Sequence, residues 1–68
     1  MDIKQKFGLR IKQLRKLKGL SQEKLANLAE IDRTYLPTIE KGDRNVSIIV
    51  IEKLAIALEV TIKDLFDE

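Results

Sequence analysis

The sequence predicts an all-α protein of five short helices in one compact bundle. Three observations predict this fold class. Apolar residues recur at spacings of three and four, which places them on one face of a helix. Residues with capping preferences stand between these periodic segments, and no hairpin pair, internal repeat or long linker interrupts the 68 residues. We therefore expect a single domain over residues 1–68, with helices at about 2–18, 21–29, 32–41, 47–58 and 61–66.

The first two predicted helices are bounded by Gly19 and Ser21. Glycine adopts the left-handed C-terminal conformation without a steric penalty, so Gly19 ends the first helix. Ser21 is expected to cap the second helix, with Glu23 in its positive first turn. The residues expected to face inward are Ile3, Phe7, Ile11 and Leu14, followed by Leu25, Ala26, Leu28 and Ala29.

The remaining three predicted helices also carry boundary residues. Asp32 is expected to be the N-cap of the third helix, and Gly42 marks its end. Ser47 caps the fourth helix, and Thr61 with Asp64 resembles a capping box that opens the last one. The residues expected to face inward are Leu36 and Ile39 in the third helix, and Ile48, Ile51, Leu54, Ala55 and Leu58 in the fourth.

The composition excludes several functions. Without cysteine or histidine the chain has no disulfide framework, no thiolate metal site and no general base of the usual kind near neutral pH. We therefore expect no metal, no cofactor and no enzymatic activity. The longest apolar run, from Ile48 to Ile51, is far shorter than the roughly 20 residues of a membrane span, and Met1 leads into charged residues. A soluble, cytoplasmic protein with no membrane partner is expected.

Charge is unevenly distributed along the chain, although the net charge is only +2. Residues 1–20 are strongly basic and residues 42–68 are acidic. Solvation of helix faces is one explanation of this pattern, and attraction to phosphates of a nucleic acid is the other. The basic residues at the front are Lys4, Lys6, Arg10, Lys12, Arg15, Lys16 and Lys18.

The segment from Gln22 to Gly42 has the organisation of a helix-turn-helix, with two short amphipathic helices joined by a tight turn. In such a unit the second helix can enter the DNA major groove while the first crosses the backbone. The segment therefore favours DNA as the partner.

With these residues placed, the chain closely resembles the Cro and phage-repressor type of helix-turn-helix regulators, the XRE family. Asp32-Arg-Thr-Tyr-Leu36 followed by Arg44-Asn-Val-Ser47 is most similar to the controller proteins of restriction-modification systems. The resemblance implies a five-helix domain that binds a roughly palindromic operator in double-stranded DNA as a homodimer, without an evident small-molecule ligand. The other matching segments are Ile11-Lys-Gln-Leu-Arg15, Lys18-Gly-Leu-Ser-Gln-Glu-Lys-Leu-Ala26, Ile39-Glu-Lys-Gly42 and Leu54-Ala-Ile-Ala-Leu-Glu-Val60.

Residues on the expected outer face of the third helix are candidates for reading DNA. Arg33, Thr34 and Thr38 are expected to point outward and correspond to base-contact positions of the family. Arg33 is the first candidate for specificity, because its guanidinium can donate twice to a guanine. The full set of predicted DNA-binding residues is Gln22, Arg33, Thr34, Tyr35, Thr38, Lys41, Arg44 and Asn45.

The other candidates have simpler expected roles, each with an alternative. The amide of Gln22 is expected to donate to a phosphate or to reach a base, and a solvated glutamine is the alternative. Tyr35 either packs beneath the helix or also reaches a phosphate through its hydroxyl. Lys41, Arg44 and Asn45 are expected to contact the DNA backbone, with ordinary solvation as the alternative for the two cations.

Arg15 and Glu40 retain the charges of a partly buried ion pair that the family resemblance implies. Breaking such a pair strands one charge, so Glu40→Ala is expected to destabilise the protein without changing its sequence preference. Glu30, Pro37 and Val46 depart from the family pattern. Glu30 replaces the usual turn glycine at a cost of roughly 1 to 2 kcal/mol, and Val46 replaces a common proline.

Pro37 is the most unusual of these residues, because it lies beyond the first turn of a helix capped by Asp32. It is expected to remove one helical hydrogen bond and to press against the carbonyl of Arg33. A tilted or 3₁₀-like first turn should result, and Pro37→Ala is expected to raise stability.

Apolar residues beyond the inward stripe predict a dimer interface, since excess exposed apolar surface usually marks a contact. Our leading hypothesis is a dimeric, sequence-specific transcriptional regulator. The alternative is an antitoxin-like or antirepressor-like interaction module, which would grip another protein through its acidic tail and last helix. The predicted interface residues are Ile49, Ile56, Ile62 and Phe66, with Val50 beside them.

Overall fold

The computed structural model describes residues 1–67, which form four α-helices and one 3₁₀ helix and contain no strand. The predicted all-α fold class is therefore confirmed. In chain order the elements are α1 (Ile3–Leu17), α2 (Gln22–Ala29), α3 (Tyr35–Glu40), α4 (Ile48–Leu58) and the 3₁₀ helix η1 (Lys63–Phe66). None of the helices within these residues is long and apolar enough to cross a membrane.

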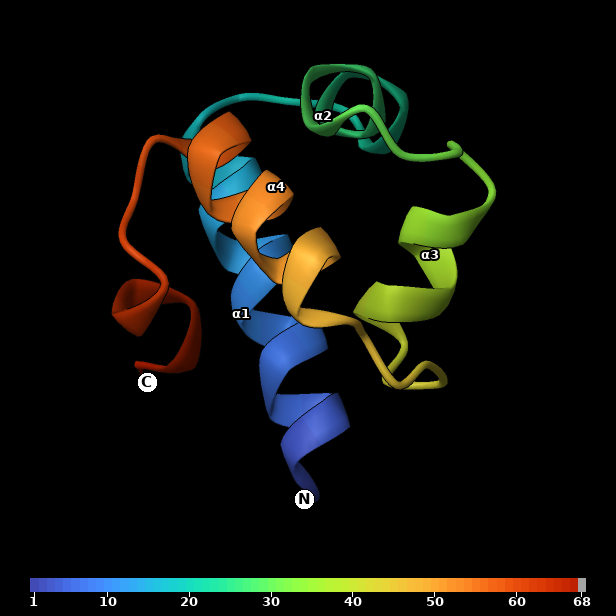
Figure 1. Ribbon diagram of the computed structural model, residues 1–68, viewed down its shortest axis with the longest axis vertical. Helices are drawn as coiled ribbons and strands as arrows, with labels where there is room; N and C mark the ends of the chain where they lie inside the picture. The colour runs from blue at the N-terminus through green and yellow to red at the C-terminus, as the bar shows by residue number, and fades with distance from the viewer. Residues whose placement is uncertain (68) are drawn as a thin grey trace.

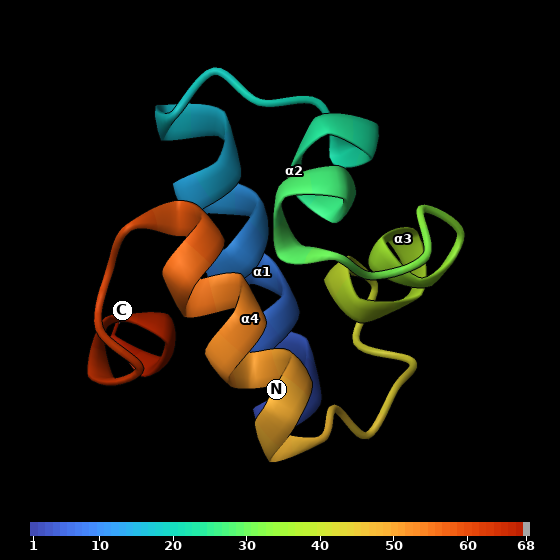
Figure 2. The same ribbon diagram turned by 45° about the horizontal axis from the view of Figure 1, so that its top comes forward.

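The helices gather around α1, which runs the length of the molecule (Figure 1). α4 lies along α1, while α2 and α3 lie on one side of these two helices and η1 on the other (Figures 1 and 2). α3 and η1 both pack against α1, and α2 packs against α4 and α3. This arrangement leaves the outer side of α2 and α3 at one edge of the molecule.

The predicted last helix over 61–66 is shorter than expected and is a single 3₁₀ turn, η1. Its predicted capping box is present: the Thr61 N–H donates to Asp64 Oδ2 at 3.0 Å, and the Asp64 N–H donates to Thr61 Oγ1 at 3.2 Å. The chain becomes extended at Asp67, so the segment has room for one turn only.

The third helix also begins later than predicted, at Tyr35 instead of near Asp32. Pro37 explains the shift, because a residue without an N–H cannot bond to the carbonyl of Arg33 and so cannot start the helix there. A 3₁₀-type bond, from the Tyr35 N–H to the Asp32 carbonyl at 3.0 Å, forms the preceding turn. The predicted 3₁₀-like turn is thus present, and Pro37 itself lies within the first turn of α3, where a missing N–H costs nothing.

The core takes at least one fully buried side chain from every element. Because each element is too short to be stable alone, this shared burial holds the bundle together. The fully buried residues are Ile11 from α1, Leu25 from α2, Leu36 and Ile39 from α3, Leu54 and Leu58 from α4, and Leu65 from η1.

Three residues that were predicted to face inward are exposed. Ile3 is 62% exposed, Leu28 is 50% exposed and Ile48 is 79% exposed. Each lies in the first or last turn of its helix, where few neighbouring side chains can cover it. Helical periodicity identifies the inner face but cannot show how far along the helix the partner elements reach.

Two glycines allow α1 to approach the end of α3 closely. A β-carbon at Gly8 would lie 2.7 Å from the carbonyl oxygen of Glu40, and one at Gly42 would lie 2.8 Å from the Cα of Gln5. Gly42 also has a left-handed φ of 82°, which favours glycine. The backbone of α3 is therefore held directly against α1, with its outer side free.

Candidate nucleic-acid interface

A left-handed turn at Glu30 joins α2 to the segment that leads into α3. Glu30 has φ 57° and ψ 43°, and the Ile31 N–H donates to the Ala26 carbonyl at 3.0 Å. The Ser21 hydroxyl caps the other end of α2 by accepting the Lys24 N–H at 3.0 Å, as predicted. Behind this unit, the buried Leu25 anchors α2 to the core.

Asp32 organises the turn between α2 and α3, although it does not begin an α-helix as predicted. Its Oδ1 accepts the Thr34 N–H at 2.8 Å and the Thr34 hydroxyl at 2.7 Å. These hydrogen bonds, from the hydroxyl first and the N–H second, lower the pKa of the Asp32 carboxyl, and the charge of Arg33 lowers this pKa further. A charged Asp32 thus fixes the backbone on either side of Arg33.

Arg33 extends from this turn into solvent, as expected for a residue that reads DNA. Its side chain is 70% exposed, and its Nη1 lies 3.2 Å from Oε2 of Glu23 on α2. Thr34 is also exposed, but its hydroxyl is already engaged by Asp32. The hydroxyl proton of Thr34 is therefore used within the protein, and its methyl group is the part of the side chain that can make an apolar contact.

Tyr35, Thr38 and Arg44 form a second cluster on α3 and the following loop. The Thr38 hydroxyl donates to the Tyr35 carbonyl at 2.6 Å and accepts the Arg44 Nε–H at 3.2 Å. The Arg44 guanidinium carbon lies 5.3 Å from the centre of the Tyr35 ring, within range of a cation–π interaction. Thr38 is half-buried and not fully outward as predicted, and its hydroxyl is engaged by both Tyr35 and Arg44.

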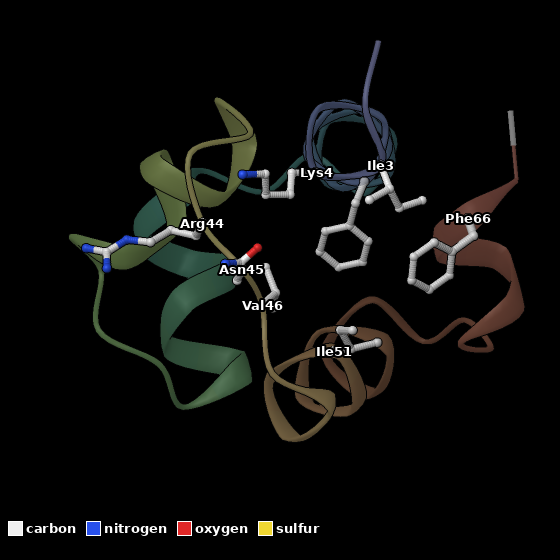
Figure 3. A pocket seen from close by; sticks show the side chains of 8 residues that line it. Ile3, Lys4, Arg44, Asn45, Val46, Ile51 and Phe66 are labelled. Carbon is white, nitrogen blue, oxygen red and sulfur yellow. The ribbon is translucent and has the colours of Figure 1, made fainter.

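Lys41 and Asn45, the other residues predicted to contact the DNA backbone, are both exposed and flank Arg44. Asn45 and Arg44 also border an apolar hollow of about 190 Å³. Figure 3 shows the Arg44 guanidinium directed away from Ile51 and Phe66, which line the opposite end of this hollow. The charged end of Arg44 is thus separated from the apolar interior.

The Arg15 and Glu40 side chains form a buried ion pair between α1 and α3. Arg15 Nε donates to Glu40 Oε2 at 2.7 Å and Arg15 Nη2 donates to Glu40 Oε1 at 3.1 Å, so the contact is bidentate. A third donor, Arg15 Nη1, reaches the Leu20 carbonyl at 2.9 Å. Both side chains are about nine-tenths buried, with exposed fractions of 11% and 5%.

Gln22 is joined to this ion pair and is not directed freely toward solvent. Its Nε2 donates to Glu40 Oε1 at 3.0 Å, and the residue is half-buried at the start of α2. An amide nitrogen has two hydrogens, so one remains for a DNA phosphate. Contact of Gln22 with DNA stays a prediction, and the structure adds a contact with Glu40 that the sequence did not indicate.

The residues predicted for a dimer interface are exposed on the far elements, α4 and η1. Ile49 and Ile56 are 67% and 70% exposed on α4, and Ile62 and Phe66 are 44% and 45% exposed at the C-terminal turn. Val50, in contrast, packs against the core. The exposed apolar residues of α4 and the C-terminal turn lie apart from the polar cluster around α3.

Sequence reasoning missed the contacts that hold the polar groups of this interface. Glu23 was predicted only to lie in the first turn of its helix. Its partner Arg33 is ten residues away, in the turn beyond the end of α2. No local spacing rule connects such positions. The same holds for the contact between Gln22 and Glu40, which are 18 residues apart.

Two short helices, joined by a left-handed turn and presenting exposed arginines at one edge, define this chain as a helix-turn-helix protein. It belongs to the helix-turn-helix family HTH_3, which matches residues 11–65. The resemblance to Cro and phage-repressor regulators, and to controller proteins of restriction-modification systems, is thereby confirmed.

Individual relatives cover nearly the whole chain. The control protein C.MunI of Mycoplasma sp is 47% identical over 68 residues, which are 98% of this chain and 92% of that protein. The crystal structure of the restriction-modification controller protein C.AhdI from Aeromonas hydrophila superposes with a TM-score of 0.89 at 52% identity, covering 91% of this chain and 94% of that one. The crystal structure of SinR, the master regulator for biofilm formation, in complex with DNA has a TM-score of 0.85 and 42% identity, covering 90% of this chain and 98% of that one.

Proposed function

We propose that this protein is a sequence-specific transcriptional regulator that binds a roughly palindromic operator as a homodimer and controls restriction-modification genes. The broader assignment, a DNA-binding regulator of the controller type, rests on family membership and on relatives that match almost end to end. The DNA in the SinR structure supports the same partner here. A DNA-binding role also agrees with the predicted cytoplasmic location.

The exposed guanidinium of Arg33, which stands in the turn before α3, is the observation that carries the proposal. Its planar fork matches the N7 and O6 acceptors of guanine, and such a contact contributes roughly 1 to 3 kcal/mol of discrimination. Thr34 supplies a methyl group beside it for a thymine methyl. In this proposal, Arg33 and Thr34 read bases.

Arg44, with Tyr35 and Thr38, is proposed to contact the DNA backbone. Arg44 is already aligned by the Thr38 hydroxyl and the Tyr35 ring, so little side-chain entropy is lost on binding. Lys41 and Asn45 extend the same contact, and Gln22 reaches a phosphate from the start of α2. These contacts set the register of α3 in the groove without reading sequence.

A homodimer would place two copies of α3 on one face of the DNA. The exposed apolar residues on α4 and the C-terminal turn would form its two-fold contact: Ile49, Ile56, Ile62 and Phe66. Two recognition helices about 34 Å apart would match successive major grooves and hence a two-part operator.

Selection of bound sequences from random duplex DNA tests the proposal, with the wild type beside Arg33→Ala and the control Lys63→Ala. Lys63→Ala removes one positive charge from η1, away from α3. We expect the wild type and the control to select the same two-part site and Arg33→Ala to lose the preference at one position in each half. Recovery of unrelated sequences by the wild type would overturn the proposal.

A further inference from the structure

Glu23 places a negative charge on the surface that should face DNA phosphates. It lies in the first turn of α2, directly after Gln22, and its side chain is 63% exposed. A carboxylate at this position repels the DNA backbone, and helix capping does not require it, because the Ser21 hydroxyl already caps α2. The positive first turn of α2 favours an acidic residue here, but this effect does not require the contact that the Glu23 side chain makes.

The carboxylate of Glu23 contacts Arg33, the residue proposed to read a base. Oε2 of Glu23 accepts from Nη1 of Arg33 at 3.2 Å. Arg33 stands in a turn and not within α3, so no helical neighbours restrict its rotamers. The backbone around it is fixed by Asp32 and Thr34, and Glu23 supplies the contact that directs its side chain.

The geometry leaves the base-reading part of Arg33 available. A guanidinium has five N–H donors in a planar fork, and engagement of Nη1 leaves the edge formed by Nε and Nη2 to donate two parallel bonds. A guanine offers two acceptors along one edge and can therefore be bound while Nη1 stays with Glu23. A DNA phosphate, in contrast, competes with the Glu23 carboxylate for the same cation.

We propose that Glu23 is a specificity-determining positioning residue, which holds Arg33 toward guanine and restrains it from binding phosphates at unrelated sequences. The proposal rests on the proposed function, because it requires that Arg33 face DNA. Glu23 then lowers the affinity for unrelated DNA sequences more than the affinity for the operator, and the ratio of these two affinities increases. Specificity would then arise in part because the contact between Glu23 and Arg33 disfavours complexes with unrelated DNA.

Binding of two duplexes of equal length tests this proposal: one selected from a random pool by the wild type, and one of random sequence. Glu23→Gln removes the charge and keeps the shape of the side chain. We expect the affinity of Glu23→Gln for the random duplex to rise roughly two- to fivefold, because an exposed ion pair contributes up to about 1 kcal/mol. Its affinity for the selected duplex should change less than twofold. The salt dependence on the random duplex should steepen by about 0.9 in log–log slope, because Arg33 gains one phosphate contact.

Two further variants separate this role from a general effect of charge. Glu30→Gln removes the same charge from the turn of the motif and is expected to change binding to both duplexes by the same factor. In an Arg33→Ala background, Glu23→Gln should also change the affinities for both duplexes by the same factor, because the side chain that Glu23 positions is absent. An unequal effect in that background would overturn the proposal by showing that Glu23 contacts DNA itself.

The same measurements distinguish failure of this inference from failure of the proposed function. If the wild type prefers its selected duplex but Glu23→Gln shifts both affinities equally, the positioning role is wrong and the regulator function stands. If the wild type shows no preference for any sequence, both are wrong. Thermal melting of Glu23→Gln within about a degree of the wild type is expected, since exposed ion pairs contribute little to stability.

Discussion

Two ion pairs that involve the helix-turn-helix differ in burial, and their loss should therefore differ in its cost to stability. The side chains of Arg15 and Glu40 are nearly inaccessible to water, whereas those of Arg33 and Glu23 are 70% and 63% exposed. Water solvates an unpaired charge at the surface but not in the interior. The buried pair is thus a structural element, and the exposed pair is free to act in recognition.

Glu40→Ala should lower the free energy of unfolding by roughly 3 to 5 kcal/mol, because it leaves the guanidinium of Arg15 buried without its carboxylate. Urea denaturation measures this change, and Glu23→Ala is the matched control, with an expected loss below about 1 kcal/mol. The DNA sequence selected by folded Glu40→Ala should match that of the wild type. Unchanged melting combined with relaxed selection would show that Glu40 acts in recognition instead.

Protonation of Asp32 and Asp64 should make the protein less stable in acid. Thr34 lowers the pKa of Asp32 through its hydroxyl and N–H, and Thr61 lowers that of Asp64 through its N–H and hydroxyl. Since each folded-state pKa lies below the ordinary value of 3.8, their stabilisation is present above that pH and is lost as the pH falls through the lower, folded-state values. Urea denaturation at pH values from about 5 to about 2 should show this loss, and Asp32→Asn should show a shallower one. An equally steep loss in the variant would contradict the assignment.

At the scale of elements, Pro37 determines where α3 begins. The helix starts at Tyr35 because the carbonyl of Arg33 receives no bond from residue 37, and the preceding turn closes through Asp32. Arg33 and Thr34 are consequently presented from a turn and not from a helix. This correction also removes the reason for expecting that Pro37→Ala would simply raise stability.

Pro37→Ala should restore a helical bond to Arg33, a gain of about 1 kcal/mol, and should lose a similar amount by loosening the unfolded chain. We therefore expect a net change in unfolding free energy below about 1 kcal/mol, measured in urea. Hydrogen exchange should show α3 beginning earlier, and the DNA sequence selected by the variant should change, because Arg33 is redirected. A selected sequence identical to that of the wild type would show that the turn does not aim Arg33.

At the scale of the whole molecule, polar and apolar surfaces are divided between its elements. Arg33, Thr38 and Arg44 lie in or beside α3, while the exposed apolar side chains of Ile49 and Ile56 lie on α4. A protein of this size buries only about 60% of its unfolded surface, so association on the apolar side would add stability. In the proposed dimer, this division would leave the surface around Arg33 open to DNA.

Ile56→Glu should convert the proposed dimer into a folded monomer. Ile56 is 70% exposed, so the substitution should cost the monomer little stability, but it would bury two like charges at a two-fold interface. Sedimentation velocity should show halved mass, and affinity for the two-part operator should fall. Leu17→Glu, at an 81% exposed leucine on α1, is the control and should remain dimeric. A wild type that sediments as a monomer, with and without DNA, would contradict the dimer.

The boundaries of most elements could be predicted from neighbouring residues. Ser21 and Ser47 cap α2 and α4 as expected, and Glu30 takes the left-handed conformation of the turn glycine that it replaces. Each of these features depends on contacts within four residues, so the order of residue types suffices to find them. The predicted start of α3 near Asp32 is wrong because two local preferences compete there. Asp32 favours an N-cap, whereas Pro37 lacks the N–H that a helix beginning at Asp32 would need.

The partners of the polar side chains could not be predicted in the same way. Periodicity predicts that Arg33, Thr34 and Thr38 point outward. It does not predict that Glu23 contacts Arg33, that Thr38 contacts Arg44, or that Gln22 joins the buried ion pair. Local capping and hydrophobic spacing were enough to specify the helices and the class of DNA-binding unit. The orientation of the reading groups depended on how α1, α2 and α3 pack, because those contacts join residues that only the folded chain brings within reach.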